Sequence, residues 1–359
     1  MAVNLMEYFN DHEHDVFVLL TEANSEGIEF QDIPEGVKII PLIAPKLPRL
    51  LRPIYRRLKP YLMIMWLKRH IKRIQPTYII STRHTATAPC YKAWKLASKP
   101  GSFFIREINP INKTLTNKKD RIPLIREAYI NADGVIANSI DVGEALKEKN
   151  WTPAHKIHVV DNPVIFKNFY KKAAESVHDE WVEDTAVPLI VSIGRLSYMK
   201  DQPTMIKAFK LIHAQRNCRL MIIGEGKDRP ELERLIQEND LQDSILLAGE
   251  RENPYPYLKR ADLFLLTSCF EGFGVVLVEA LALGKKIVST HCVGGPGPIL
   301  NYGEFGRLVP VGDIQAISAA VIESLDAEVD EQKLIARAQE FSVEAIGKKY
   351  ETIMLAGKS

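Results

Sequence analysis

The sequence lacks the features that mark several common protein classes. Only four of its 359 residues are cysteines, and they have neither CxxC nor Cys/His zinc spacing. A disulfide framework is therefore excluded, and no metal site is expected. No uninterrupted apolar run approaches the roughly 18 residues that a membrane-spanning helix needs. Residues 1–35 contain no Lys or Arg, so we do not expect a secretory signal there.

Charge of one sign is missing from two long segments. Residues 1–35 hold nine acids and no base, whereas residues 36–106 hold 16 Lys and Arg and no acid, within a chain whose net charge is only +2. In residues 46–74 the bases interleave with Leu, Ile, Tyr, Met and Trp. This pattern fits either a solvated helical hairpin or a patch on an anionic membrane surface, where each base contributes about 1 kcal/mol.

We favour the membrane surface as the partner of residues 46–74. Nucleic acid is not expected as a partner, because no RNA- or DNA-binding motif accompanies the charge. Pro53 and Pro60 argue against one continuous helix over this segment.

Short apolar, β-branched runs alternate with helix-period segments along the chain. They predict strands at 16–20, 37–42, 77–82, 102–107, 134–139 and 156–162, and again at 188–194, 218–224, 244–249, 263–268 and 286–290. Two successive alternations predict an α/β protein with two Rossmann-like, doubly wound parallel sheets. We expect a first domain at 1–167, a linker at 168–187, a second domain at 188–340 and a closing helix at 341–359 that returns toward the first domain. Ligands should bind at the carboxyl ends of the strands, in the cleft between the domains.

The stretch CFEGFGVVLVEALALGK, from Cys269 onward, follows a buried strand directly. It predicts a turn and then a helix that ends at Gly284. Glu271 falls in the turn, where Gly272 and Gly274 let the backbone approach a ligand and aim the free N–H groups of the first helical turn at it. Glu279 falls inside the apolar helix, where a lone carboxylate would cost several kcal/mol without a partner.

Two cations follow the first strand of the second domain. Arg195 and Lys200 lie in SIGRLSYMKD, and two cations beside a helix amino terminus suit a diphosphate. The segment IIGEGKDRP offers G-x-G after a strand, but Arg229 occupies the third glycine position. The dinucleotide fingerprint is thus broken, which disfavours a nicotinamide or flavin enzyme.

The motifs GRLSYMKDQPTMIKAF, LMIIGEGKDRPELERLI, ADLFLLTSCFEGFGVVLVEALALGKKIVST and GEFGRLVPVGD, in this order, resemble glycosyltransferase family 4. The resemblance is strong from residue 188 to about residue 315 and weak before it, and Glu271 to Glu279 matches the family's E-x7-E signature. It implies the GT-B fold and a retaining, nucleotide-sugar-dependent hexosyltransferase. Among members of the family, the sequence most resembles bacterial enzymes that build lipopolysaccharide, capsule or lipid-linked glycans.

The resemblance also implies roles for individual residues. Gly194, Arg195 and Lys200 would hold the donor diphosphate, and Glu271 would face the transferred sugar. The backbone of Gly272, Phe273 and Gly274 would cap the sugar hydroxyls and the diphosphate. Glu279 would bind the ribose hydroxyls, and Glu250 and Arg251 would lie beside the nucleobase. Arg195, Lys200 and Glu271 are the residues expected to be catalytic; no cofactor or metal is implied. On the acceptor side, His84, Arg106 and Glu107 are candidates that can equally be structural.

The expected function is transfer of a hexose or N-acetylhexosamine from a UDP-sugar to a glycan or lipid-linked glycan in cell-envelope polysaccharide synthesis. The protein should be cytoplasmic and peripheral on the inner face of the cell membrane. A non-catalytic nucleotide-sugar-binding protein and a GT-B epimerase are the alternatives. The chain departs from the family where THCVGGPGPIL carries no Asp near His291 and no Glu near Pro298. It also opens on a helix without the usual first strand and glycine-rich loop, so the first sheet should lack a central strand.

Overall fold

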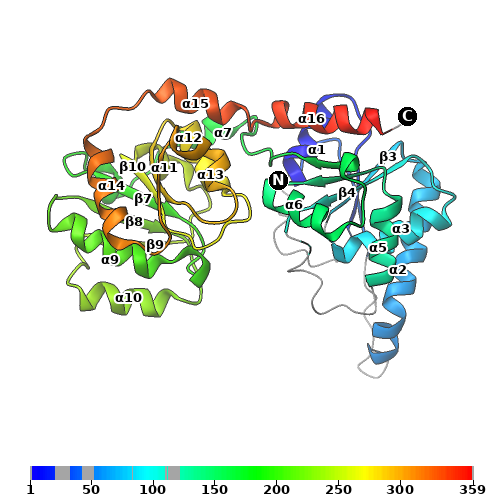
Figure 1. The fold of residues 1–359 in the computed structure, drawn as a ribbon, viewed down its shortest axis with the longest axis horizontal. Coiled ribbons are helices and arrows are strands. Elements are labelled where there is room, and N and C mark those ends of the chain that lie inside the picture. Colours follow the sequence, from blue (N-terminus) through cyan, green and yellow to red (C-terminus); the bar gives the residue numbers. More distant parts are fainter. Residues whose placement is uncertain are drawn as a thin grey trace. The chain divides into compact units, whose positions relative to one another are not determined.

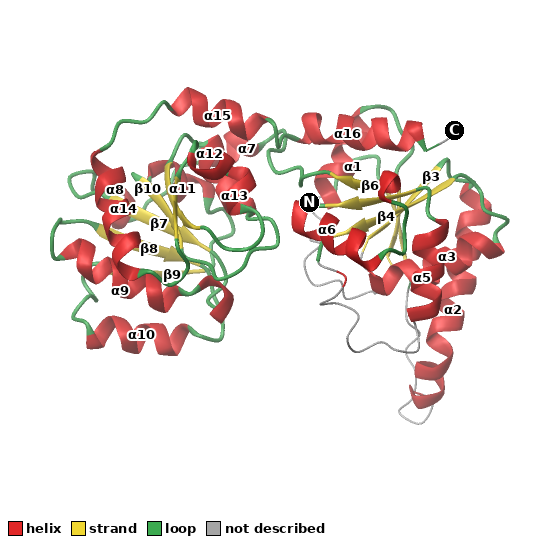
Figure 2. Ribbon diagram, in the orientation of Figure 1, coloured by secondary structure: helices red, strands yellow, loops and turns green. Residues whose placement is uncertain are grey.

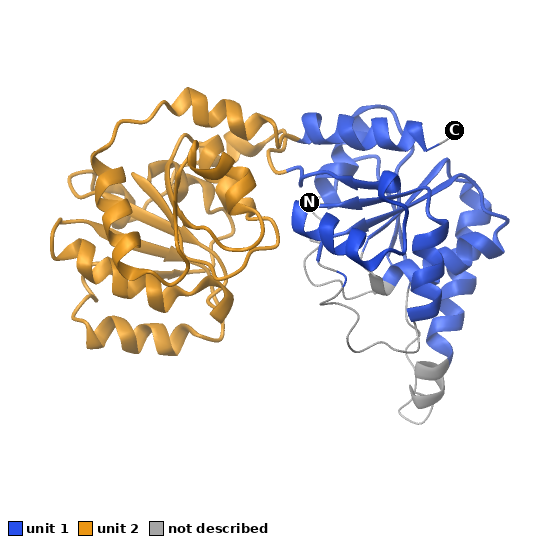
Figure 3. Ribbon diagram, in the orientation of Figure 1, with its two compact units in different colours: residues 1–163, 343–359 blue, residues 164–342 orange. Residues whose placement is uncertain are grey.

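The computed structural model describes residues 2–20, 33–42, 52–82, 84–109, 111 and 122–357, without the side chains of residues 52–57, 84 and 85. The chain forms two compact units (Figure 3). Unit 1 combines residues 1–163 with residues 343–359, and unit 2 spans residues 164–342. The cleft expected between the two domains stays a prediction.

Unit 2 is built on one six-stranded parallel sheet of order β12-β11-β10-β7-β8-β9 (Figure 1). The strands are β7 (Leu189–Ile193), β8 (Arg219–Ile223), β9 (Ile245–Gly249), β10 (Leu263–Leu266), β11 (Lys286–Thr290) and β12 (Arg307–Val309). The helices are α7 (Phe169–Ala173), α8 (Glu180–Glu183), α9 (Gln202–His213), α10 (Arg229–Glu238), α11 (Tyr255–Arg260), α12 (Val275–Ala282), α13 (Pro296–Ile299), α14 (Ile314–Asp326) and α15 (Glu331–Gln339).

The sheet of unit 2 is buried on both faces. Every residue of β10 is buried, as the continuous apolar sequence LFLL predicts for a central parallel strand. Helices α9, α10 and α14 share one apolar core with the strands, while α12 packs on α11 and α15 (Figure 2). The strand order reverses between β7 and β10, which is the point where ligands bind in open α/β sheets.

Unit 1 contains two parallel sheets rather than one. Strands β1 (Phe17–Leu20) and β2 (Lys38–Pro41) pair with each other, and β3 (Tyr78–Thr82), β4 (Ser102–Glu107), β5 (Gly134–Ala137) and β6 (Ile157–Val159) form the second sheet. The described helices with assigned bounds are α1 (Ala2–Asp11), α2 (Arg52–Ile74), α3 (His84–Leu96), α5 (Ile122–Asn131), α6 (Ile140–Lys149) and α16 (Val343–Ala356). Among the described residues, no strand joins β1 to β3.

The last helix belongs to unit 1. Helix α16 packs against α1, where Gly347 lies against the ring of Tyr8 and the Tyr8 hydroxyl donates to Glu351 at 3.0 Å. Asn4 of α1 also donates to the carbonyl of Pro163 at 2.8 Å. The chain therefore closes its first unit with residues that come after the whole second unit.

Two expectations are wrong. Residues 168–187 are not an uncompacted linker, because they contain α7 and α8 and belong to unit 2. Phe169 is fully buried there, with its ring 4.8 Å from that of Tyr255, so one aromatic residue anchors a segment of polar composition. Helix α2 is continuous despite Pro60. A proline removes one backbone hydrogen bond, and the apolar packing of Ile64, Leu67 and Ile71 offsets that loss.

We expect Gly347→Ala to destabilise the contact between α16 and α1 by about 1–3 kcal/mol, because a Cβ at this position would strike the Tyr8 ring. The direction of the change in stability is informative, since replacing glycine by alanine at an unobstructed helix position stabilises a helix by up to about 1 kcal/mol. Hydrogen exchange of α1 and α16 in the full chain measures the change. Lys349→Ala, at an exposed position of the same helix, is the control. Slower exchange in Gly347→Ala would contradict the packing described.

Candidate functional site

The predicted site residues of unit 2 gather at the carboxyl edge of its sheet, on both sides of the strand-order reversal. The loop after β7 carries Gly194, Arg195 and Lys200, and the loop after β10 carries Glu271. Thr267 joins the two loops, because its hydroxyl donates to the carbonyls of Lys200 and Asp201, at 3.0 Å each. The Cys269 N–H also donates to the carbonyl of Met199 at 2.9 Å.

Lys200 and Glu271 meet directly. Lys200 Nζ lies 2.6 Å from Glu271 Oε1, with the two side chains 20% and 9% exposed. The hydroxyl of Ser268, which is fully buried, donates to the same oxygen at 2.6 Å. An ammonium has three N–H donors, so two remain on Lys200 for a ligand. Neither bond uses Glu271 Oε2.

The glycine turn after Glu271 leads into α12. Gly274 has φ 87° and caps the helix, a backbone conformation that favours glycine. A Cβ on Gly272 would meet no atom within 4 Å, so the backbone of this turn is open to a ligand. Phe273 is buried, and its carbonyl lies so close to Gly295 that no Cβ fits there. The segment around His291 and Pro298, which departs from the family, thus packs against the turn.

Glu279 lies on α12, one turn beyond Val275, and is 9% exposed. Burial raises the pKa of its carboxyl to about 7, and the Tyr255 hydroxyl, which donates to Oε1 at 3.3 Å, partly offsets the rise. Tyr255 comes from α11, and its ring is tilted against that of Phe169. The partner expected for this buried acid is therefore a tyrosine, a residue that the sequence analysis did not single out.

Arg195 and the loop after β9 lie on the same edge of the sheet. Arg195 is exposed, and its guanidinium forms no ion pair with a carboxylate of the described residues, while its carbonyl accepts from Gln202. Gly224 bridges the loops: its N–H donates to the carbonyl of Gly249, and a Cβ on it would strike the carbonyl of Gly194.

The pair Glu250 and Arg251 follows Gly249 directly. Glu250 is exposed, whereas Arg251 is half-buried, lies over the ring of Tyr257 and has its Nε buried without a hydrogen-bond partner. Close contacts of glycine backbones thus bring this pair to the edge that carries Lys200.

The acceptor-side candidates of unit 1 have different surroundings in the structure. Arg106 is 5% exposed and donates to the Tyr350 hydroxyl and to Asn162, so it ties β4 to α16 and is structural. Glu107 is also buried, accepts from the Tyr129 hydroxyl, and has a pKa raised by burial to about 7. The side chain of His84 lies outside the described residues.

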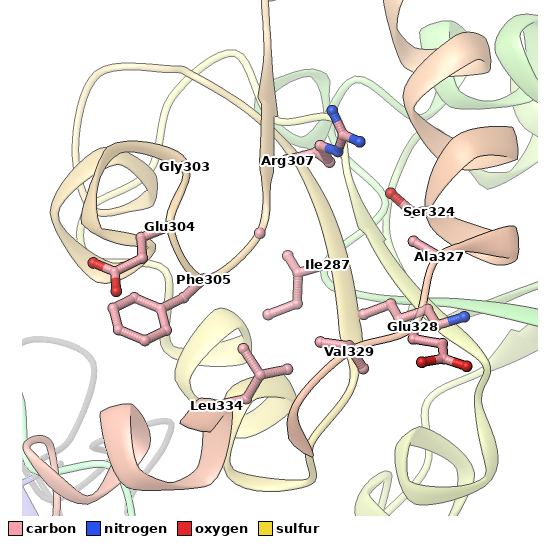
Figure 4. A pocket seen from close by; sticks show the side chains of 12 residues that line it. Ile287, Gly303, Glu304, Phe305, Arg307, Ser324, Ala327, Glu328, Val329 and Leu334 are labelled. Carbon is pink, nitrogen blue, oxygen red and sulfur yellow. The ribbon is translucent and has the colours of Figure 1, made fainter. Parts of the chain in front are cut away.

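A separate pocket of about 170 Å³ lies at the amino ends of β11 and β12 (Figure 4). Ile287, Val329 and Leu334 line it, and two of its charged side chains already have partners: Lys286 donates to the carbonyl of Leu325, and Glu304 pairs with Lys333. We assign it no role. Within the described part of the chain, no cluster of His, Cys, Asp and Glu has the arrangement of a metal site, and no helix is long and apolar enough to cross a membrane.

Two family models match consecutive parts of the chain. Residues 1–166 match the model described as Glycosyltransferase Family 4, and residues 174–341 match the model described as Glycosyl transferases group 1. The fold agrees with this pairing: the crystal structure of Anabaena HepE in complex with UDP superposes with a TM-score of 0.77 at 18% identity, covering 98% of this chain and 95% of that one. The predicted GT-B architecture is thus confirmed.

Curated relatives share sequence mainly with part of the chain. The chain is 31% identical over 211 residues to the N-acetylgalactosamine-N,N'-diacetylbacillosaminyl-diphospho-undecaprenol 4-alpha-N-acetylgalactosaminyltransferase of Campylobacter jejuni, covering 59% of this chain and 54% of that protein. It is 26% identical over 229 residues to the lipopolysaccharide core biosynthesis glycosyltransferase LpsE of Rhizobium meliloti, covering 62% and 64%. The chain spans about half the length of the first curated relatives it matches.

The raised pKa of Glu279 predicts a pH-dependent stability. The folded chain keeps this proton up to about pH 7, whereas an unfolded carboxyl releases it near 4.5, so the free energy of unfolding falls as pH rises through that window. Glu279→Gln removes the ionisation. We expect the stability of the wild type relative to this variant to fall by on the order of 3 kcal/mol between pH 4 and pH 8. Denaturant titrations measure it, with the exposed Glu250→Gln as control; equal pH slopes for wild type and Glu279→Gln would contradict the assignment.

Proposed function

This chain belongs to the glycosyltransferases that join a family 4 domain to a group 1 domain, and on that premise we propose that it transfers a sugar from a nucleotide sugar to a cell-envelope glycan. The sugar is a hexose or N-acetylhexosamine, the donor is a UDP-sugar, and the acceptor is a glycan or a lipid-linked glycan. The observation that carries the proposal is the Lys200–Glu271 pair beside the open glycine turn.

The donor fits this edge of the sheet through its charges. The diphosphate oxygens accept hydrogen bonds from the two free N–H donors of Lys200, from the guanidinium of Arg195 and from the N–H groups at the start of α12. Glu279, beside Tyr255, accepts from the ribose hydroxyls, and Glu250 and Arg251 lie by the base. Glu271 has two tasks: Oε1 holds Lys200, and Oε2 faces the transferred sugar.

The reaction needs stabilisation of a leaving group more than a protein nucleophile. The bond from the anomeric carbon to the diphosphate breaks, and the acceptor oxygen bonds to that carbon on the same face, so that configuration is retained. The acceptor proton passes to the departing phosphate oxygen. Lys200 and Arg195 stabilise the charge that develops on the diphosphate, and preorganised groups of this kind are worth about 3–4 kcal/mol each.

The acceptor in this proposal lies at the membrane. A lipid-linked acceptor lies in a leaflet, and the basic segment 46–74 of unit 1 suits attachment to the inner, cytoplasmic face of the cell membrane. The relatives named above include an enzyme whose name contains diphospho-undecaprenol and one of lipopolysaccharide core synthesis.

A thermal-shift experiment with UDP in EDTA, followed by turnover of a panel of nucleotide sugars with a lipid-linked acceptor, tests the proposal. We expect UDP to raise the melting temperature without metal, and at least one UDP-sugar to be consumed only when acceptor is present. Glu271→Ala should retain nucleotide binding and lose turnover by about a hundredfold or more. UDP binding without turnover would instead indicate a nucleotide-sugar-binding protein, and interconversion of free UDP-sugars would indicate an epimerase. UDP binding that strictly requires a divalent metal would contradict the proposed site.

Ser268 is a positioning residue of this site, because its hydroxyl holds the same Glu271 oxygen as Lys200. We expect Ser268→Ala to lower kcat by about tenfold while KM for the donor changes less, since the bond lost orients Glu271 and does not touch the nucleotide. Ser289→Ala is the matched control, because Ser289 is equally buried on β11 and bonds only to the carbonyl of Thr290 among the described residues. Equal effects of the two variants would remove Ser268 from this role.

A further inference from the structure

The outward side of α2 carries a row of large apolar side chains. Leu58, Tyr61, Leu62 and Met65 are 49%, 66%, 50% and 55% exposed. Their spacing of i, i+3, i+4 and i+7 places them on one side of a helix. Figure 2 shows α2 beside α3 in unit 1. Four exposed apolar residues on one helix side form a patch, unlike single exposed residues, which are ordinary.

The opposite side of α2 already supplies the contact with the rest of unit 1. Ile64, Leu67 and Ile71 are 9%, 2% and 2% exposed and share an apolar core with Tyr91 and Trp94 of α3. At 100° per residue these three side chains point away from the exposed row. The exposed row is therefore not needed to hold α2 on unit 1.

Cations continue the exposed row along the same side of the helix. Arg69, Lys72 and Arg73 are exposed, and none of them forms an ion pair with a described carboxylate. The whole segment from residue 36 to residue 106 contains no acid that could pair with them. The helix side thus has an apolar half followed by a cationic half.

We propose that this side of α2 is a membrane-insertion surface for an anionic bilayer. Leu58, Tyr61, Leu62 and Met65 enter the boundary between headgroups and acyl chains, and Arg69, Lys72 and Arg73 contact lipid phosphates. The inference rests on the proposed function, which places the acceptor in a membrane, and it adds an apolar contribution to the electrostatic one. Charge complementarity selects this occupant, because a second copy of the chain would bring cations against cations.

Flotation with vesicles of phosphatidylglycerol and phosphatidylcholine tests the surface. We expect the wild type to bind anionic vesicles and to keep part of that binding at about 0.5 M salt, where exposed charges are largely screened. Leu62→Ser/Met65→Ser should lower the partition coefficient by at least about tenfold and abolish the salt-resistant part. Leu355→Ser, at a side chain 57% exposed on α16 of the same unit, should leave binding unchanged.

Two further arms separate the outcomes. Arg69→Gln/Lys72→Gln should reduce vesicle binding at low salt and leave the salt-resistant part of the binding unchanged. In the Tyr61→Trp variant, brominated acyl chains should quench the fluorescence of the new tryptophan. Equal losses in the Leu62/Met65 and Leu355 variants, no quenching, or a loss of self-association in light scattering with no change in vesicle binding would overturn the inference. Transfer to a water-soluble acceptor analogue is measured in parallel, so that failure of the surface is distinguished from failure of the proposed function.

Discussion

The contact between Lys200 and Glu271 is the interaction on which the candidate site depends. It joins the loops that follow β7 and β10, the two strands between which the sheet order reverses. Thr267 and Ser268 reinforce this contact, because Thr267 donates to the carbonyl of Lys200 and Ser268 donates to Glu271. The contact with a partly buried carboxylate holds the Lys200 side chain in place and leaves it two further N–H donors. In the function proposed above, the open glycine turn and the amides at the start of α12 complete an anion-binding edge around this ammonium.

Much of the architecture could be predicted because it follows from local pattern. The continuous apolar runs predicted β7 to β11, and the stretch CFEGFGVVLVEALALGK predicted a turn followed by a helix. Strand β12 was missed, since Arg307–Val309 is three residues long and carries a charge. The pairing of Lys200 with Glu271 could not be predicted, because the two residues are 71 positions apart and only the parallel order of β7 and β10 brings them together. Tyr255 was missed because it reaches Glu279 from a different helix. Ser268 was missed because nothing in the local pattern distinguishes a buried serine that bonds to Glu271 from any other buried serine.

The two wrong expectations share a physical cause. Composition suggested an uncompacted segment at 168–187 and a broken helix over 46–74, but one buried ring at Phe169 and three buried aliphatic residues on α2 outweighed the local pattern. Tertiary packing commonly overrides propensity in this way. The charge pattern of residues 36–106 did predict a basic face, yet the apolar row beside it became visible only once the structure showed which side chains of α2 are exposed.

Lys200, held by Glu271, is proposed to bind the donor diphosphate, and calorimetric titration of UDP in a double-mutant cycle tests that claim. The cycle compares the wild type, Lys200→Met, Glu271→Gln and the double variant, which leaves no unpaired charge at the pair. Because a charge-assisted contact to a diphosphate is lost, we expect both variants lacking Lys200 to bind UDP at least about tenfold more weakly, whereas Glu271→Gln alone should bind within a few-fold of the wild type. Wild-type affinity in the double variant would contradict the claim.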